Sequence, residues 1–387
     1  MGEQRRRRRA GTAAALLLVS VLAGCGDDGY EPRGPFRPLP QGPPPQVGPP
    51  TESTPAPAPG DPADPNSGEQ AGDPNVVAAG LTVPTGLVLL PDGTAVVGER
   101  DTGRLLQVFP DRSPARELMT VPGVDTAGDG GLLGLALSPT FDEDGLLYAY
   151  VSTATDNRVV RFPIGGTPNP VLTGIPRGEV RNGGGLAFGF DGTLYVGTGD
   201  TGNPALAQDP ASLAGKVLHI DVFGQPVGAS PVHSRGHGNV TALCLSGEET
   251  VYATDDAPQG RDELNAVLAG SNHGWPDGAP EATGPVVDFP GEEAGPGGCA
   301  VAARTVFLGA LDGQRIHIVE LDDSGAVVDE PTAFLGGQYG RLRTVVAALD
   351  GALWITTSNR DGIGTPAEDD DKVLRILPPS SSADSPL

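Results

Sequence analysis

The chain has 387 residues and a formal net charge of −24, with 58 glycines and 40 prolines. So acidic a protein is a poor match for nucleic acid, and the abundance of glycine and proline argues against a helical fold. Its three cysteines lack the CxxC spacing of a zinc site.

The N-terminus has the pattern of an export signal. Arg5–Arg9 form a basic stretch, Ala13–Ala23 form an apolar one, and small residues precede Cys25. The apolar run is too short to span a membrane and resembles a bacterial lipoprotein signal, in which cleavage before the cysteine is followed by lipidation. An ordinary secretory peptide with a chance cysteine is the alternative. We therefore expect residues 1–24 to be a signal peptide and the protein to be a cell-membrane lipoprotein that faces the extracellular or periplasmic side.

Residues 25–73 are rich in Pro, Gly, Asp, Glu and Ser and contain few large apolar side chains. Such a composition buries too little surface to offset the entropy of ordering, so a disordered tether is predicted. The folded part is predicted at 74–378, followed by a disordered tail at 379–387. No later segment has the 18 consecutive apolar residues of a membrane span, so lipid would be the only anchor.

One hairpin pattern recurs six times in the folded part, at a spacing of roughly 50 residues. Asp-Gly between two runs of alternating apolar and polar residues indicates a hairpin, because its turn needs positive φ. The expected turns are Asp92-Gly93, Asp144-Gly145, Asp191-Gly192, Gly247-Glu248, Ala303-Arg304 and Asp350-Gly351. The repeat predicts an all-β, six-bladed β-propeller, in which an N-terminal strand near 77–83 or 84–89 completes the last blade.

The two cysteines of the folded part fall in adjacent predicted blades. In an oxidising compartment Cys244 and Cys299 are candidates for a disulfide, and two buried free thiols are the alternative.

Seven motifs occur in one order across the folded part. They are GLLGLALSP (131–139), GLAFGFDGTLYVGTGD (185–200), AQDPASLAGKVLHID (207–221), GHGN (236–239), DELN (262–265), NHGWP (272–276) and GQYGRLRTV (337–345). This order resembles that of the soluble aldose sugar dehydrogenases and glucose/sorbosone dehydrogenases, six-bladed propellers that use pyrroloquinoline quinone (PQQ). The resemblance implies oxidation of a sugar at C1 by hydride transfer to PQQ, with calcium polarising the reactive carbonyl.

The family takes the substrate proton with the histidine of a pattern like H-x-G-G-R-[LI]. The segment that matches it here is 181–186, so Arg181 stands at the position of the catalytic histidine and Gly185 at that of the arginine. An arginine, whose pKa is above 12, does not act as a base near neutral pH.

The cofactor residues are implied by two further motifs. Gly236–Asn239 resembles the family's G-H-R-N, which assigns His237 and Asn239 to the cofactor but leaves Gly238 where an arginine would pair with a PQQ carboxylate. Asp312 likewise stands where relatives tend to carry a cation.

Arg341 and Arg343 match the family's late pair of cofactor-facing arginines. Alternation along a strand places both side chains on one face, where they would converge on a ligand. Surface ion pairs with the acidic chain are the alternative.

Calcium takes oxygen ligands, including backbone carbonyls. The resemblance assigns one calcium to Ala257 and Pro258 and a second to Glu263 and His273. Turn and capping chemistry is the alternative for Asp262 and Glu263.

Two hypotheses follow. The first is a PQQ- and calcium-dependent aldose dehydrogenase that passes electrons to a carrier protein. The second is an inactive propeller of the same family that binds a carbohydrate or a protein in the cell envelope, which the residues at 181, 185 and 238 favour. Hydrolysis is not expected, because the sequence places no histidine and carboxylate together at one mouth of the propeller.

Overall fold

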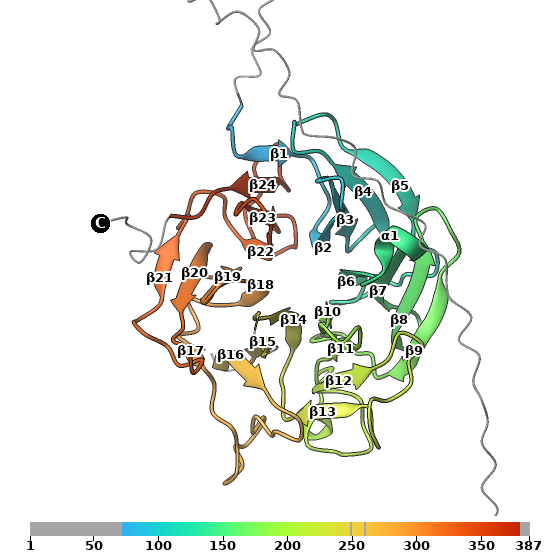
Figure 1. Cartoon of the computed structure of the whole chain (residues 1–387), viewed down its shortest axis with the longest axis vertical. Helices are drawn as coiled ribbons and strands as arrows, with labels where there is room; N and C mark the ends of the chain where they lie inside the picture. Colours follow the sequence, from blue (N-terminus) through green and yellow to red (C-terminus); the bar gives the residue numbers. More distant parts are fainter. Residues whose placement is uncertain (1–71, 248–249, 259–260, 380–387) are drawn as a thin grey trace, which may run out of the picture. The chain divides into compact units, whose positions relative to one another are not determined.

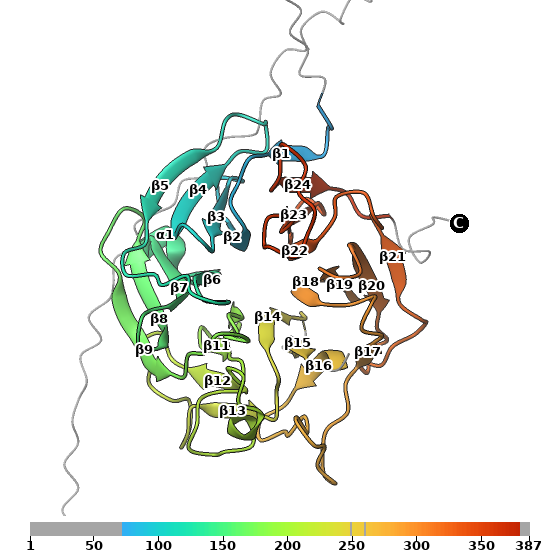
Figure 2. The same ribbon diagram turned by 180° about the vertical axis from the view of Figure 1, so that it is seen from behind.

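The computed structural model describes residues 72–247, 250–258 and 261–379. Within them the chain forms six four-stranded antiparallel sheets around one axis (Figure 1; Figure 2 gives the view from behind). The all-β, six-bladed propeller predicted from the repeat is therefore confirmed. The predicted signal peptide, the linker up to residue 71 and the tail from residue 380 lie outside the described residues.

The first three blades follow the chain from the inside outwards. Blade 1 contains β2 (Pro84–Leu89), β3 (Ala95–Glu99), β4 (Arg104–Val108) and β5 (Arg116–Thr120). Blade 2 contains β6 (Leu132–Leu137), β7 (Leu146–Ser152), β8 (Asn157–Pro163) and β9 (Asn169–Ile175). Blade 3 contains β10 (Leu186–Phe188), β11 (Leu194–Gly197), β12 (Lys216–Ile220) and β13 (Val232–Arg235).

The next three blades have the same order. Blade 4 contains β14 (Val240–Leu245), β15 (Val251–Ala257), β16 (Arg261–Val267) and β17 (Val287–Phe289). Blade 5 contains β18 (Pro296–Ala302), β19 (Thr305–Ala310), β20 (Arg315–Glu320) and β21 (Thr332–Phe334). Blade 6 contains β22 (Leu342–Ala347), β23 (Leu353–Thr357), β24 (Val373–Ile376) and β1 (Val76–Ala78).

Helical structure in the described part is limited to two short turns, α1 (Phe141–Asp144) and η1 (Pro204–Ala207). No helix there is long and apolar enough to cross a bilayer.

The ring is closed by the N-terminal strand. β1 pairs antiparallel with β24, with Val76 opposite Leu374 (Figure 1). The prediction that an N-terminal strand completes the last blade is confirmed, at 76–78. The other candidate, 84–89, is instead the innermost strand of blade 1, where all its residues except Leu89 are buried. Pairing the first and last strands of the propeller in one sheet covers the edge of β24 and closes the ring.

The direction of the strands gives the propeller two faces. All six innermost strands run the same way, so the turns after them share one face, which we call the lower face. The Asp-Gly turns there have the expected left-handed glycines, with φ of 82° at Gly93, 79° at Gly192 and 83° at Gly351. The loops that precede the innermost strands gather at the other end, which we call the upper mouth.

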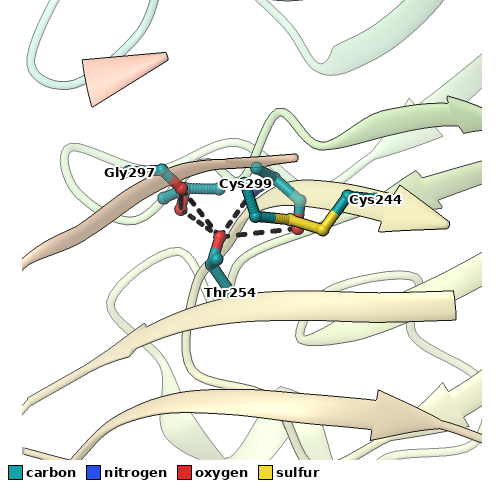
Figure 3. The surroundings of a disulfide bond; sticks show 6 residues. Cys244, Thr254, Gly297 and Cys299 are labelled. Atoms are coloured by element: carbon teal, nitrogen blue, oxygen red, sulfur yellow. Dashed lines mark hydrogen bonds between the residues drawn. A yellow bond between two sulfur atoms is a disulfide. The ribbon is translucent and has the colours of Figure 1, made fainter. Parts of the chain in front are cut away.

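A disulfide joins blades 4 and 5. Cys244 on β14 bonds Cys299 on β18, with the two Cα atoms 5.8 Å apart (Figure 3). Beside it, the Thr254 hydroxyl donates a hydrogen bond to the Gly297 carbonyl at 2.8 Å. The sequence left open whether the two cysteines are bridged or are free thiols. They are bridged, and the bond links two innermost strands at the wall of the axial channel.

Candidate functional site at the upper mouth

The predicted cofactor residues come from blades 3, 4 and 6. Arg181 precedes β10, Asn239 precedes β14, and Arg341 and Arg343 lie at the start of β22. All four therefore belong to the upper mouth, although they are far apart in sequence. A narrow axial cavity below the mouth is lined by Arg343 and by the glycines at 183–185.

Arg181 stands where the resemblance places a histidine. Its backbone lies in the left-handed region, with φ of 56°. Its guanidinium forms an ion pair with Asp200, from Nε to Oδ1 at 2.7 Å, and the Asp200 side chain is completely buried. Trp275 donates its indole N–H to the other Asp200 oxygen at 2.9 Å. Both members of the pair are engaged, so neither is a ready acceptor for a proton from a substrate hydroxyl.

The two late arginines have different surroundings. Arg341 is held between Asp312, at 2.5 Å from Nη1, and Asp361, at 2.8 Å from Nε. Arg343 donates from Nε to the Ser358 hydroxyl at 3.0 Å, and burial lowers its pKa to about 10. Arg341 thus forms ion pairs with acidic residues, which was the alternative to a cofactor-facing role, but its guanidinium is buried in the mouth and does not lie on the surface. Asp312 pairs with the guanidinium of Arg341, which would otherwise be free to meet a ligand.

Glycines fill two positions at which the resemblance places arginines. A Cβ on Gly238 would lie 2.7 Å from the Cβ of Ala257 on the neighbouring strand. A Cβ on Gly185 would lie 3.1 Å from the carbonyl carbon of Ala242. The first contact is shorter than two carbon atoms tolerate, and the second is tight. The neighbouring residues therefore pack directly against both glycines and leave little room for a side chain at either position.

A buried hydrogen-bond network lies directly behind the mouth. Nδ1 of His237 is 3.0 Å from Asp255 Oδ2, and its Nε2 is 2.8 Å from the Ser234 hydroxyl. Asp255 also accepts the backbone N–H of Asn239 at 2.7 Å, and the ring of His273 stacks on His237 at 4.6 Å. The expectation that no histidine and carboxylate meet at one mouth is therefore wrong. The three side chains are buried, so they fix the loop before β14 and are closed to a substrate.

Two aspartates face each other beside this network. Asp256 on β15 is the cross-strand partner of Asp262 on β16. Asn239 donates from Nδ2 to Asp256 at 3.4 Å, and Asp262 accepts the N–H of Gly295 at 3.0 Å. Burial raises the pKa of Asp256, and it raises that of Asp262 to about 7. Opposed carboxylates in a poorly solvated place repel each other, which favours protonation near neutral pH.

The four residues assigned to calcium lie on or near blade 4. Ala257 ends β15, Pro258 follows it, and Glu263 lies on β16, where it accepts a hydrogen bond from Asn265 at 3.1 Å. Nδ1 of His273 is 3.1 Å from the Asn265 side-chain oxygen. In the part of the chain that the structure describes, no three His, Cys, Asp or Glu side chains are grouped to hold a metal ion. Calcium binding stays a prediction.

Comparison with known proteins identifies the family. The family model described as glucose/sorbosone dehydrogenase matches residues 81–283 and 301–365. The PQQ-bound form of aldose sugar dehydrogenase from Streptomyces coelicolor superimposes with a TM-score of 0.75 and 41% identity, covering 78% of this chain and 96% of that one. A putative oxidoreductase (glucose dehydrogenase) from Thermus thermophilus gives 0.72 and 35%, covering 78% and 98%.

A third similar protein has a lower sequence identity. Quinoprotein glucose dehydrogenase B of Acinetobacter calcoaceticus is 26% identical over 252 residues, which cover 53% of this chain and 52% of the enzyme. This chain therefore matches about half the length of that relative. The family match over most of the propeller, together with the six-bladed fold, shows that the chain belongs to the glucose/sorbosone dehydrogenase family.

Proposed function

We propose that this protein binds a carbohydrate at the upper mouth without oxidising it through a quinone. The proposal is carried by one observation, the ion pair between Arg181 and buried Asp200 at the position of the family's proton acceptor. Hydride transfer from a sugar hydroxyl needs a group that takes the proton. An arginine that is already paired does not supply one.

The charges of the mouth also do not fit PQQ. The cofactor carries three carboxylates and needs cations that are free to meet them. Arg181 and Arg341 are neutralised by aspartates, which leaves Arg343, whose Nε donates to the Ser358 hydroxyl, as the one of these three guanidinium groups that forms no ion pair with a described residue. Gly185 and Gly238 supply no cation, and Asp312 adds a negative charge. Three further carboxylates would therefore meet unfavourable electrostatics at this mouth.

A neutral, hydroxyl-rich ligand suits the same groups. Sugar hydroxyls donate to carboxylates and accept from guanidinium and amide groups, and they add no net charge to the paired ions. Asp312 has half of its side chain exposed while it contacts Arg341, so a ligand can reach one of its oxygens. The similar proteins include glucose and aldose sugar dehydrogenases, which supports an aldose as the class of ligand.

The experiment is a titration of the purified protein with glucose and other aldoses. Binding is measured by calorimetry and by the change in the thermal midpoint of unfolding. We expect saturable sugar binding that raises the midpoint by mass action. The variant Asp312→Ala should weaken binding at least tenfold, whereas Asp323→Ala on the lower face should leave it unchanged. No binding of any aldose, or equal effects of the two variants, would contradict the proposal.

The second candidate function is PQQ- and calcium-dependent oxidation of an aldose at C1, with electrons passed to a carrier protein. It is favoured by the 41% identity to a PQQ-bound aldose sugar dehydrogenase. A titration with PQQ and calcium decides between the two. A shift of the quinone absorbance, a higher thermal midpoint and aldose-dependent dye reduction would support the second candidate, and their absence at saturating cofactor would exclude it.

The location of the protein is part of the proposal. Cys25 after an apolar, small-residue segment supports export and attachment to the membrane through lipid. The variant Cys25→Ser should lose the lipid mass in intact-protein mass spectrometry and move from the membrane fraction to the medium or periplasm. Unchanged mass and fractionation would contradict lipidation.

A further inference from the structure

The axial cavity below the upper mouth has a cation in its wall but no carboxylate. Among the described residues that line it, Arg343 is the one charged side chain, and the others are glycines, threonines, aliphatic residues and the bridged Cys299. The threonine hydroxyls, at positions 85, 241 and 344, each donate a hydrogen bond to a backbone carbonyl. The wall of the cavity therefore presents a positive charge that no acidic side chain in it offsets.

The guanidinium of Arg343 is held in place at one nitrogen. Its Nε donates to the hydroxyl of Ser358, which is completely buried. Its two terminal nitrogens form no hydrogen bond with a described residue, and neither is sealed from water. Because a guanidinium has five N–H donors in a rigid plane, those on the terminal nitrogens remain available to a ligand in the cavity.

The charges around Arg343 do not neutralise it. Burial lowers its pKa to about 10, so the guanidinium is charged at neutral pH. Of the charged groups that act on it, Arg341 and Asp361 pair with each other at 2.8 Å. Arg100 is a second cation, and burial raises the pKa of Asp256, which favours the uncharged form of that carboxyl group. The charge of Arg343 is thus left without an ion-pair partner.

A single carboxylate is the ligand group that matches a single free guanidinium. The two are planar and form paired, charge-assisted hydrogen bonds, which are stronger than bonds between neutral groups. The cavity has a volume of about 120 Å³, whereas a water molecule needs only roughly 10–15 Å³, so a carboxylate has room beside Arg343. One carboxylate is balanced here, although three would not be.

The cavity adjoins the groups that the proposed sugar site uses. Arg343 follows Arg341 by two residues, and the guanidinium of Arg341 contacts Asp312, which has half of its side chain exposed. Asp256 lies within electrostatic range of both Asp312 and Arg343. One monosaccharide can therefore bring a hydroxyl group to Asp312 and a charged substituent to Arg343.

We infer that the aldose bound at the upper mouth is a uronic acid, whose C6 carboxylate pairs with the guanidinium of Arg343. This inference rests on the proposed function, because it names the class of sugar for that same site. The hydroxyl groups of the sugar meet the arginines and aspartates that are already paired, and its one negative charge meets the one guanidinium that is not. A uronic acid keeps the aldehyde carbon at C1 and is still an aldose.

The test compares three ligands that differ only at C6, which are glucuronate, glucuronamide and glucose. Titration calorimetry on the purified protein, at one pH and one ionic strength, gives the affinity for each. Glucuronate should bind at least about tenfold more tightly than glucuronamide, because only the carboxylate forms charge-assisted hydrogen bonds with a guanidinium. This comparison uses the wild-type chain, so it does not depend on the folding of a variant.

Two arginine variants locate the carboxylate. Arg343→Gln should abolish the preference for glucuronate over glucuronamide, because the glutamine side chain is neutral. Arg304→Gln removes an arginine from an exposed ion pair on the lower face and should leave the preference unchanged. The thermal midpoints of the two variants show whether each is folded.

Four outcomes separate the inference from the proposed function. If the sugars bind but glucuronate binds no more tightly than glucuronamide, the inference is wrong and the proposed function stands. If no sugar binds, both are wrong. If the two arginine variants reduce the preference equally, the carboxylate does not lie at Arg343. If acetate alone binds as tightly as glucuronate, the cavity takes small carboxylates and does not select a sugar acid.

Discussion

The two ends of the axial channel are built by the same six strands but have opposite chemistry. At the upper mouth, arginines and aspartates pair with one another, as in Arg181 with Asp200 and Arg341 with Asp312. At the lower end the channel widens into a cavity whose wall is largely aliphatic and whose charged lining residues are Asp350 and Arg375, which pair with each other. The upper residues belong to loops, which tolerate exchange, whereas the lower ones belong to strands that must pack. The fold of the family can therefore be retained when residues of the mouth are exchanged.

The largest expected effect concerns the disulfide, which lies on the channel wall between the two ends. Replacing Cys244 and Cys299 by alanine opens a loop with a sequence separation of 55 residues. We expect a loss of about 4 kcal/mol in the free energy of unfolding, because the unlinked chain gains entropy when it unfolds. Urea unfolding measures it, and wild type under reducing conditions is the control. A loss below about 1 kcal/mol would mean that the blades hold together without the link.

The next largest effect separates buried from exposed ion pairs. Asp200→Asn should lower the free energy of unfolding by about 3 kcal/mol, because Arg181 keeps its charge and loses its buried partner. Asp323→Asn breaks the exposed pair with Arg304 on the lower face and should cost less than about 0.5 kcal/mol. Equal costs would contradict the contrast between a buried charged mouth and a solvated lower rim.

The pH dependence of stability should differ in sign between the two ends. Burial raises the pKa of Asp262 to about 7, so the folded state holds this proton between about pH 4 and 7 while the unfolded state releases it. Its contribution to stability is therefore present at low pH and is lost as the pH rises to about 7. Relative to Asp262→Asn, wild type should lose about 2 kcal/mol over this window.

The control lies on the lower face. A hydrogen bond from Ser324 lowers the pKa of Asp322, so its contribution appears above the unfolded pKa and is lost in acid. Unfolding titrations of Asp262→Asn and Asp322→Asn between pH 3 and pH 8 compare the two. The same sign of pH dependence at both positions would refute the assignment of a buried, protonated carboxyl group to the upper mouth.

The smallest effect concerns exposed apolar residues. Leu349→Ser on the lower face and Ile363→Ser at the upper mouth should each change the free energy of unfolding by less than about 0.5 kcal/mol, because both side chains are already in water. Thermal unfolding of the full chain measures this. A larger loss at either position would mean that the side chain makes a stabilising contact, which contradicts its exposure.

Much of the fold could be predicted from the local pattern. Asp-Gly turns between alternating runs define hairpins, and their even spacing defines blades, because turn chemistry and side-chain alternation act over a few residues. The limits of the N-terminal strand that closes the ring were harder to predict from the sequence. Three residues at 76–78 complete blade 6 through their pairing with β24, and such pairing depends on a partner far away in sequence.

The site was predictable only in part. The motifs located Arg181, Asn239 and the two late arginines at one mouth, but not their partners. No local pattern connects Trp275 with Asp200, or Asp255 with His237, because these contacts depend on how separate loops meet above the sheets. The pairing of Arg341 with Asp312 has the same origin.

The sequence by itself determined that this protein is a six-bladed propeller of the glucose/sorbosone dehydrogenase type, since turn signals and motif order are properties of short segments. Only the tertiary structure decided that Arg181 and Arg341 are paired with aspartates, that Cys244 and Cys299 are bridged, and that the far end of the channel widens into a cavity with a largely aliphatic wall. Charge pairing and cavity lining depend on distances across the ring, and a linear chain does not contain them until it folds.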